Sequence, residues 1–432
     1  MATSSRQSPS TPPSGLGEMQ KREMWLAYGM LAPTFLMVLA IVLFPLLANF
    51  WISFKPVTLG DLRAPVPVAN ERLRGKAETV GDEVTLQYRL RGSAPKKAIE
   101  GVVLEDVLPE GLEITELDER CTLDGRNLRC DLGNFDPGFR GELTLPAVAG
   151  QAFVDDPVNP RDSKPVLQGK ADNILTSAEF TLDNFRRIFS SPDFWGVLRV
   201  SLYYTIFGTA GALLLGLFAA QLLNTVFPGR SILRGLFLFP YVAPVIAVAF
   251  TWVILLDPFS GSLNAVMRQV GAIDQPINFF GQRSVPISFL GLTIDFPVAL
   301  TTVIVFEAWR YFPLSFLFIL ARMQSIPSDM YEAAEIDGAT PLQQFWHISL
   351  PQLAGILAVL FLLRFIWTFN KFDDIFLLTG GGAGTRTLTV DVYEQGFAVS
   401  NLGAGAAVAV VVFIVLLVFA TIFIRYAPKD DG

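Results

Sequence analysis

Glu307, Arg310 and Arg364 are ionisable residues inside otherwise apolar runs of the chain. Charged side chains are costly in a bilayer, so they usually face the protein interior, a partner or water. Glu307 and Arg310 stand three residues apart on one helical face, and we expect an intramembrane ion pair between them. A structural pair and a contact to substrate both remain open. Arg364 has no partner in its own helix; meeting Glu307, facing another subunit and lining a transport path are the three alternatives.

Further polar residues follow Arg364 in the same run. Asn370, Asp373 and Asp374 lie beside the aromatic residues Trp367 and Phe372. Ligand sites combine apolar and aromatic walls with a few placed polar groups, and this mixture suits a polyol. Arg364, Asn370, Asp373 and Asp374 are therefore our candidates for the substrate path. Ordinary solvation of a helix end is the alternative interpretation.

The chain has two cysteines, Cys121 and Cys130, on either side of an Asp124-Gly125 pair. Asp-Gly favours a hairpin turn, which would bring the thiols together. The segment is predicted outside the cytoplasm, where disulfides persist, so we expect a disulfide. Two buried thiols are the alternative. No metal site is expected, because the single histidine, His347, is predicted on the other side of the membrane.

The composition is typical of a membrane protein. Hydrophobic residues make up 51% of the 432 residues, charged residues make up 17%, the mean hydropathy is +0.44 and the formal charge is -7. A surface that tracks nucleic-acid phosphates needs the opposite charge, so a nucleic-acid binder is excluded. With a single histidine, no catalytic triad or metal centre can be assembled, so we expect no catalytic residues and no enzyme activity.

Six runs are long enough to cross a bilayer, which takes roughly 20 apolar residues. They cover 25–54 and about 200–227, 235–256, 296–321, 353–378 and 402–424. The distribution of Lys and Arg over the short loops places both termini in the cytoplasm. Residues 1–24 are predicted to be a disordered cytoplasmic tail, 180–425 a membrane domain and 426–432 a second cytoplasmic tail.

The segment 61–173 is charged and turn-rich and interrupts the spans. Apolar and polar residues alternate at 83–90 and 112–117, and 99–108 reads as a further strand. We expect a periplasmic β-sandwich here, loosely similar to immunoglobulin-like repeat domains of bacterial surface proteins. The predicted fold class is an all-α polytopic membrane protein with six transmembrane helices and this inserted domain.

The cytoplasmic loop 323–351 contains signals for two short helices. Ser328 can cap the first helix, with Asp329 in its first turn. Gly338 suits the position after its last turn. Thr340 and Pro341 are typical of the start of a second helix. Each helix is too short to be stable alone in water, so we expect a partner to hold the pair.

The same loop reads EAA, three residues, Gly, nine residues, Ile, one residue, Leu-Pro. This spacing resembles the signature of permease subunits of bacterial binding-protein-dependent ABC transporters. The matching residues are Glu332, Ala333, Ala334, Gly338, Ile348, Leu350 and Pro351, and Asp337 also fits. Segments 182–205, 222–264 and 372–397 are similar to the carbohydrate-uptake branch of that family, of the maltose and glycerol-phosphate type.

The resemblance implies a multi-pass protein of a bacterial inner membrane that forms half of the path for a sugar or related polyol. Its implied partners are a second permease subunit of different sequence, two cytoplasmic ATPases and a periplasmic substrate-binding protein. The ATPases would bind ATP and grip the loop, with Glu332 in polar contact, the alanines closely packed and Gly338 at the bend. No cofactor is expected in this chain, which lacks a G-x-x-x-x-G-K-[ST] motif.

Two other functions stay open. The same machinery would equally import a non-sugar solute, such as an osmolyte or an organophosphate. A membrane-anchored receptor with an external ligand-binding sandwich is the third possibility. The insert stands where maltose-type permeases carry an external domain that touches the binding protein, and by analogy of location we expect the same contact here.

Overall fold

The computed structural model describes residues 18–93, 97–158, 164–289 and 292–427. Five helical stretches of this part are long and apolar enough to cross a membrane: Met19–Ser53, Phe194–Asn224, Val298–Gln324, Pro341–Phe369 and Leu402–Tyr426. A sixth span exists only if a strongly bent helix pair is counted as one. The chain is therefore a mostly helical polytopic membrane protein, as the sequence predicts.

The N-terminal span is one long helical stretch. α1 (Glu18–Val38) continues through a π-helical turn (Leu39–Leu43) into α2 (Phe44–Ser53), and Pro33 lies inside α1. Its apolar part is not buried by the described residues. Apolar side chains around the whole helix are thus left for lipid or for another chain.

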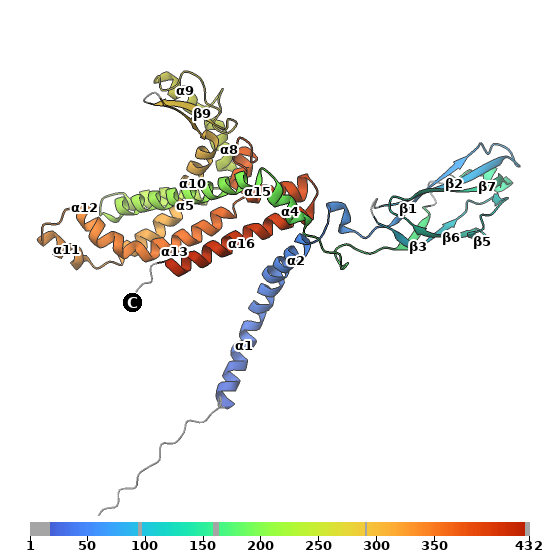
Figure 1. Ribbon diagram of the computed structural model, residues 1–432, viewed down its shortest axis with the longest axis horizontal. Helices are drawn as coiled ribbons and strands as arrows, with labels where there is room; N and C mark the ends of the chain where they lie inside the picture. Colours follow the sequence, from blue (N-terminus) through green and yellow to red (C-terminus); the bar gives the residue numbers. More distant parts are fainter. Residues whose placement is uncertain (1–17, 94–96, 159–163, 290–291, 428–432) are drawn as a thin grey trace, which may run out of the picture. The chain divides into compact units, whose positions relative to one another are not determined.

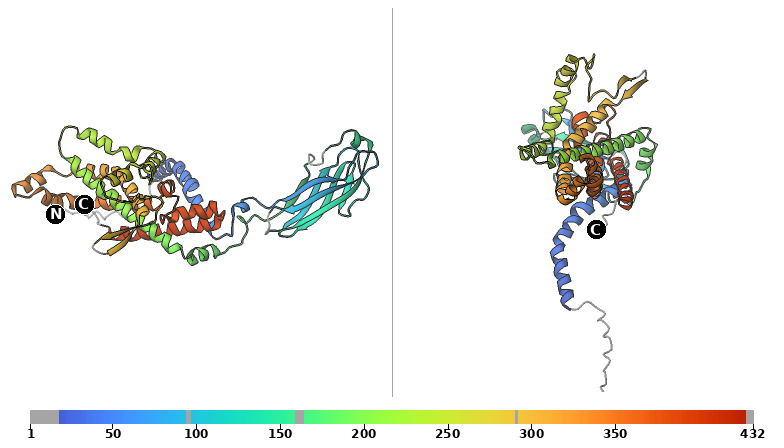
Figure 2. Two further views of the ribbon diagram at one scale, coloured as in Figure 1. Left: turned by 90° about the horizontal axis from the view of Figure 1, so that it is seen from above. Right: turned by 90° about the vertical axis from the view of Figure 1, so that its left-hand side faces the viewer.

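In the described residues between α2 and the remaining spans, a 3-10 turn (Leu59–Leu62) is followed by eight strands and a short helix (Figure 1). Sheet A has the order β1-β2-β7-β4 and sheet B the order β5-β6-β3-β8, and all neighbouring strands are antiparallel. The bounds are β1 (Pro67–Arg74), β2 (Glu83–Gly92), β3 (Ile99–Val107), β4 (Leu112–Ile114), β5 (Cys121–Asp124), β6 (Asn127–Phe135), β7 (Arg140–Ala149), α3 (Gln151–Asp155) and β8 (Val166–Lys170). Figure 2 shows the strands side by side in two layers.

Side chains from both sheets form one apolar core. Leu86 and Tyr88 of β2, Leu104 of β3 and Leu128 of β6 are almost fully buried in it. Alternate residues of these strands face outward, which is the two-residue period of a strand with one buried face. The strands predicted at 83–90 and 99–108 correspond to β2 and β3, whereas the one predicted at 112–117 is shortened to β4.

The β5–β6 hairpin brings the two cysteines together. Asp124 pairs with Asn127 across the turn, where Gly125 has φ +61°. Cys121 lies directly opposite Cys130, and the two sulfur atoms form a disulfide. The Asp-Gly pair therefore sets the register that places one cysteine beside the other.

Backbone hydrogen bonds tie the two connecting segments of the insert to the helical part. The N–H of Thr181 donates to the Phe54 carbonyl at 2.7 Å, and the Asn184 amide donates to the Lys55 carbonyl at 2.8 Å. The N–H of Gly403 donates to the Val57 carbonyl at 2.9 Å. A Cβ at position 403 would lie 2.3 Å from the Lys55 carbonyl oxygen, so glycine is required for this close approach. We call this junction the neck.

The helical part is built around long helices that run side by side in both figures. They are α5 (Phe194–Asn224), α10 (Val298–Gln324), α13 (Leu350–Phe369) and α16 (Leu402–Tyr426), and the short helix α4 (Asp183–Ser190) precedes α5. Helices α5 and α10 are in close contact at Gly216, where a Cβ would lie 2.6 Å from the Ser315 Cβ. Small residues at such a point let membrane helices pack backbone to backbone.

The third predicted span, 235–256, is not one helix. α6 (Arg230–Phe237) and α7 (Phe239–Val242) are followed by α8 (Val245–Leu255), and the two parts meet at 92°. The break falls at Ala243, whose ψ of 142° is extended, directly before Pro244. Proline disfavours the helical conformation in the residue before it and has no N–H to donate, which explains where the helix stops.

The fifth predicted span, 353–378, is also divided. α13 ends at Phe369, and the separate helix α14 (Asp373–Thr379) begins with two aspartates. Carboxylates are favourable at a helix N-terminus, so Asp373 and Asp374 start a new helix better than they would continue the old one. The remaining elements of this part are α9 (Ser262–Gln269), the hairpin of β9 (Val285–Phe289) and β10 (Leu292–Phe296), and α15 (Leu388–Tyr393).

Candidate functional site

The EAA loop is a bent, exposed connection between two spans. Its first helix, α11 (Ser328–Ile336), has no buried residue. After it, Gly338 takes φ +80°, a conformation that side chains with a Cβ rarely adopt. Thr340 then forms a capping box with Gln343, and Pro341 is the first residue of α12 (Pro341–Gln344). The predicted bend at Gly338 and the predicted cap at Thr340 are confirmed.

Two details of the loop differ from the prediction. Ser328 is the first helical residue rather than the cap, which is Pro327 and makes no side-chain hydrogen bond. The second helix is not short. α12 continues through a π-helical turn (Phe345–Ser349) into α13, so that residues Pro341–Phe369 form one helix. The Leu350-Pro351 pair does not end it. Pro351 has no N–H to donate to the preceding turn, and that turn is the π-helical one (Phe345–Ser349), where the regular α-helical hydrogen bonding is already interrupted.

The structure places the signature residues along this connection. Glu332, Ala333, Asp337 and Gly338 are exposed on or just after α11, and Ala334 is half-buried. On the long helix, Ile348 and Leu350 are half-buried and Pro351 is exposed. The Tyr331 hydroxyl and the Ser349 hydroxyl are 2.9 Å apart and hold α11 against the long helix. This tether was missed from the sequence, where nothing links two residues 18 positions apart.

Four large apolar side chains around the bend are exposed. They are Met330 (39% exposed), Ile336 (87%), Leu342 (67%) and Trp346 (57%). Exposed apolar residues gathered on one segment mark a surface that contacts another protein or a membrane. The described part of the chain thus leaves these four side chains around the bend uncovered.

A buried polar cluster joins three spans. Glu307 of α10 accepts hydrogen bonds from Arg364 at 2.6 Å and Thr368 at 2.9 Å, both on α13, and from the Tyr204 hydroxyl of α5 at 2.9 Å. Glu307 is 0% exposed and Arg364 is 2% exposed. The predicted Glu307–Arg310 pair is therefore wrong. The partners of the Glu307 carboxylate come from facing helices, whereas the Arg310 side chain is directed toward Ala243 and Asp374.

Arg310 has a different environment. Its guanidinium donates to the Ala243 carbonyl at 3.3 Å and its Nε lies 3.9 Å from the Asp374 Oδ1. Ala243 is the residue at which the α7–α8 pair breaks, and its carbonyl has no helical partner there. Arg310 therefore satisfies a backbone group that the bend leaves free, which is how broken helices are tolerated inside membranes.

The second group of charges surrounds Tyr311. The Lys371 Nζ donates to the Tyr311 hydroxyl and lies 3.8 Å from Asp374 Oδ2. The Arg364 guanidinium lies 4.5 Å from the Tyr311 ring centroid, and the Lys371 Nζ lies 4.1 Å from it. Cations over an aromatic face are attracted by its quadrupole. Tyr311, Tyr204 and Thr368 were not singled out from the sequence, because their partners lie on other helices.

The remaining substrate-path candidates are divided by their exposure. Asn370 is exposed and its amide donates to the Ile366 carbonyl of its own helix at 2.9 Å. The Asp373 side chain is 50% exposed, whereas Asp374 is fully buried. In this conformation Arg364 and Asp374 are buried between helices, and Asn370 and Asp373 are the accessible pair.

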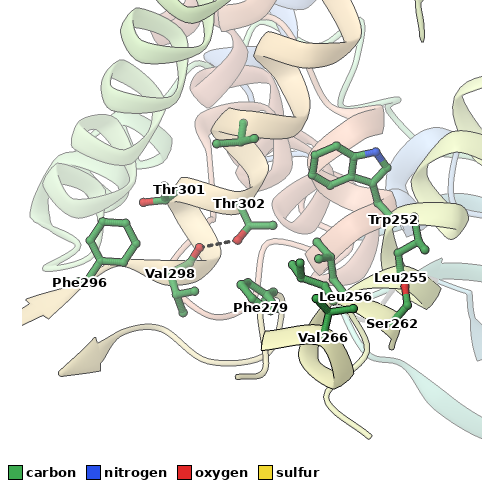
Figure 3. Close-up of a pocket in the computed structure, with 12 residues that line it drawn as sticks. Trp252, Leu255, Leu256, Ser262, Val266, Phe279, Phe296, Val298, Thr301 and Thr302 are labelled. Carbon is green, nitrogen blue, oxygen red and sulfur yellow. Dashed lines mark hydrogen bonds between the residues drawn. The ribbon is translucent and has the colours of Figure 1, made fainter. Parts of the chain in front are cut away.

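The hollow in Figure 3 is apolar and does not contain this polar cluster. It has a volume of about 610 Å3 and is formed by α8, α9, α10 and the segment around Phe279. Its polar groups are few, and the Thr302 hydroxyl is engaged by the Val298 carbonyl at 2.8 Å. Most of the lining side chains, such as Leu256 and Val266, cannot hydrogen-bond to a hydroxylated ligand, so the hollow suits lipid or apolar side chains.

Comparison with known proteins places the helical part in a transport family. The model of the binding-protein-dependent transport system inner membrane component matches residues 212–429. The inner membrane ABC transporter permease protein YcjO of Escherichia coli is 36% identical over 244 residues, which are 56% of this chain and 77% of that protein. The trehalose/maltose transport system permease protein MalF of Thermococcus litoralis is 31% identical over 245 residues, 56% of this chain and 78% of that protein.

A solved structure has a similar fold. It is a bacterial ABC transporter involved in the import of the acidic polysaccharide alginate, with a TM-score of 0.52 and 20% sequence identity. The match covers 60% of this chain and 86% of that one. The matched family region begins at residue 212, so the strands of sheets A and B lie outside it.

Proposed function

We propose that this chain, which belongs to the family of inner membrane components of binding-protein-dependent transport systems, forms half of the path for a sugar or related polyol. Membership of the family makes it an inner-membrane ABC transporter permease, a channel component and not an enzyme. The proposal adds the solute class, the coupling through the EAA loop and the orientation, with both termini in the cytoplasm. A sugar is favoured because the relatives include a permease named for trehalose and maltose.

The exposed loop carries the proposal. α11 buries none of its own residues, yet it presents Ile336 and, after the bend, Leu342 and Trp346. A nine-residue helix has little stability of its own in water, so a surface of this kind needs a second protein to cover it. We assign that role to a cytoplasmic ATPase, which binds the ATP and moves the loop. Two such ATPases and a second permease of different sequence complete the proposed transporter.

A cross-linking experiment tests the contact. A photoreactive residue at Ile336 should capture a nucleotide-hydrolysing protein when the transporter is purified intact. The same label at Leu123 in β5, which is 39% exposed, is the matched control and should capture no such protein. If the label at Ile336 captures only lipid or nothing, the proposed contact is wrong.

A second experiment tests the coupling. Gly338→Val places a β-branched residue at φ +80°, although a Cβ there would meet no atom within 4 Å. Any loss of solute-stimulated ATP hydrolysis should therefore come from backbone strain and not from crowding. Gly338→Asn should retain much of the hydrolysis, because Asn tolerates this conformation. We expect solute-stimulated ATP hydrolysis to fall with valine while membrane insertion is unchanged. Glu332→Gln should lower hydrolysis through the lost charge.

The accessible polar pair gives the proposed solute contacts. Asn370 and Asp373 lie at the end of α13 and the start of α14 and offer an amide and a carboxylate to hydroxyl groups. Arg364 and Asp374 are buried behind this surface, and we assign them the role of holding the helices that carry it. Asn370→Ala and Asp373→Asn should raise the solute concentration needed for half-maximal transport. Unchanged dependence on solute in both variants would remove these residues from the path.

The strand insert is proposed to be a periplasmic β-sandwich that touches the substrate-binding protein. Its two antiparallel sheets and shared core support the sandwich, and its disulfide suits an oxidising compartment. Deleting 62–171 and measuring association of the binding protein tests the contact. Association at full strength without the insert would discard it.

A further inference from the structure

The outward side of sheet A is rich in arginine. Arg89 and Arg91 of β2 alternate with the buried residues Tyr88 and Leu90, so they point away from the core. Register places Arg140 of β7 opposite Arg91, and Asn70 of β1 opposite Arg89. By the same alternation β1 adds two more arginines. The arginine face therefore consists of Arg72, Arg74, Arg89, Arg91 and Arg140.

These five side chains are exposed and make no hydrogen bond or ion pair with the part of the chain that the structure describes. Three other arginines of the insert, Arg120, Arg126 and Arg129, are paired. Arg129 of β6 forms an ion pair with Glu105 on the neighbouring strand. Arg120 lies 2.8 Å from Asp118, and Arg126 lies 3.8 Å from Glu110. The arginine face is thus distinct from the ordinary charged surface of the same domain.

The arrangement of these charges has a cost in the isolated chain. Arg91 lies directly opposite Arg140, and like charges in such cross-strand pairs are destabilising. The nearest carboxylate on the face, Glu142, is opposite Arg89. The chain as a whole has a formal charge of -7, so a general excess of basic residues does not account for the face. An anion bound between the guanidinium groups would remove the repulsion.

The face is hollowed as well as charged. One hollow of about 680 Å3 is lined by Arg91, Arg140 and Glu142, and a second of about 620 Å3 is lined by Arg72 and other residues of the β1 edge. Asn70 and Arg89 line both, so the two hollows are neighbours. Each is as large as the ligand pockets of soluble proteins.

The composition of the face identifies the kind of ligand. The exposed large apolar side chains of the insert lie elsewhere, at positions such as Val107, Leu123 and Val166. Protein interfaces have an apolar core, and this face offers none. Guanidinium groups match carboxylates and phosphates, while Asn70 and Glu142 can hydrogen-bond to hydroxyl groups.

We propose that the arginine face of sheet A binds an acidic oligosaccharide, whose sugar units carry carboxylate or phosphate groups. The site lies outside the helical part, and its occupation requires neither the ATPase contact nor the solute path. It therefore goes beyond the function proposed above, and each can fail without the other. The shared chemistry is a hydroxylated chain with repeated negative charges.

Binding to the purified full-length chain tests this assignment. The probes are a galacturonic acid pentasaccharide, a phosphorylated pentasaccharide, neutral maltopentaose and hexaglutamate. We expect at least one acidic glycan to bind roughly tenfold or more tightly than maltopentaose, because charge-assisted hydrogen bonds to arginine distinguish them. Whichever acidic glycan binds more tightly identifies carboxylate or phosphate as the recognised group. Affinity should fall as NaCl rises from about 0.05 to about 0.5 M.

Matched triple variants locate the site. R89Q/R91Q/R140Q removes three charges from the arginine face and should weaken acidic-glycan binding at least roughly tenfold. R120Q/R126Q/R129Q removes three charges from the rest of the same domain and should change it less than about twofold. Equal resistance of both variants to proteolysis shows that folding is intact.

Four results would overturn the proposal. They are equal affinity for maltopentaose, tighter binding of hexaglutamate than of either acidic glycan, equal loss in the two triple variants, and binding that appears only on nanodiscs of anionic lipid. Tighter binding of hexaglutamate would indicate an acidic protein as the partner, and the last result would indicate the membrane surface.

Discussion

Glu307 is the residue on which the packing of three spans converges. Its carboxylate is fully buried and accepts hydrogen bonds from Arg364, Thr368 and Tyr204, which come from two other helices. Ion pairs of this kind contribute little by their mere presence, because desolvation offsets the attraction. Removing only one of the two charged side chains is strongly destabilising, because the other charge then stays buried without a partner.

The first prediction concerns this pair. Glu307→Leu should lower the free energy of unfolding by about 3–5 kcal/mol, because Arg364 would be left buried without its carboxylate. The double variant Glu307→Leu, Arg364→Met should recover much of the loss. Thermal unfolding of the detergent-purified chain measures both. A double variant no more stable than the single one would show that the two side chains do not depend on each other.

The second prediction concerns the insert. The Tyr88 hydroxyl donates to Asp106 at 2.6 Å inside the core. Burial, with the nearby Asp106 carboxylate, raises the pKa of Tyr88 well above its usual value of 10.0. The folded state therefore favours the neutral phenol. Its contribution is fully present below about pH 10 and declines as the pH rises above it, because only the unfolded chain then ionises readily.

Pulse proteolysis of the insert against pH measures this effect. The wild type should lose stability above about pH 10, while Tyr88→Phe should lose less there. At pH 7 the same substitution should cost about 1–3 kcal/mol, because Asp106 loses its donor. A Phe variant as alkali-sensitive as the wild type would place the titrating group elsewhere.

At the scale of elements, the contact between α5 and α10 depends on Gly216. A Cβ there would lie 2.6 Å from the Ser315 Cβ and 2.8 Å from the Phe316 backbone nitrogen. Gly216→Ala should therefore push the helices apart and cost about 1–3 kcal/mol. Gly196→Ala in the same helix meets no atom within 4 Å and should be neutral or slightly stabilising. Thermal unfolding compares the two, and equal effects would contradict the close approach.

Elements were predictable from the sequence where a local pattern decides them. The apolar runs gave the spans, alternation gave β2 and β3, and the Thr340-Pro341 pair gave a helix start. Pro244 predicts a kink in its span, but the size of the bend, 92°, and the division of α13 from α14 were not predicted. Both lie in stretches that are apolar enough to span, so hydropathy alone sees no boundary there.

The candidate site was predictable only in part for a similar reason. The bend at Gly338 follows from one residue, and the structure has it. The partner of Glu307 is 57 positions away, on a helix whose rotation the sequence does not reveal. The spacing within α10 predicted Arg310 as the partner of Glu307, whereas the packing of α13 against α10 makes Arg364 its partner.

At the scale of the whole molecule, the proposed orientation puts the EAA loop in the cytoplasm and the loop after α8 outside. A cysteine at Ser260 should react with an impermeant maleimide on intact cells, and one at Ile336 should react only after permeabilisation. Cys121 and Cys130 form a disulfide and do not compete for the reagent. Reaction at Ile336 in intact cells would invert the topology and remove the proposed ATPase contact.

The neck has a consequence for how the insert and the last span behave together. Both of its connecting segments are hydrogen-bonded to neighbouring backbone, and one of them is bonded to Gly403 in the first turn of α16 and to Ser400 just before it. A force on the sheets is thus transmitted to the first turn of α16, because the connecting segment is hydrogen-bonded to it and is not a free loop. A pull on the strands would therefore load the Val57–Gly403 and Leu59–Ser400 hydrogen bonds, which couples the insert mechanically to the start of the last span.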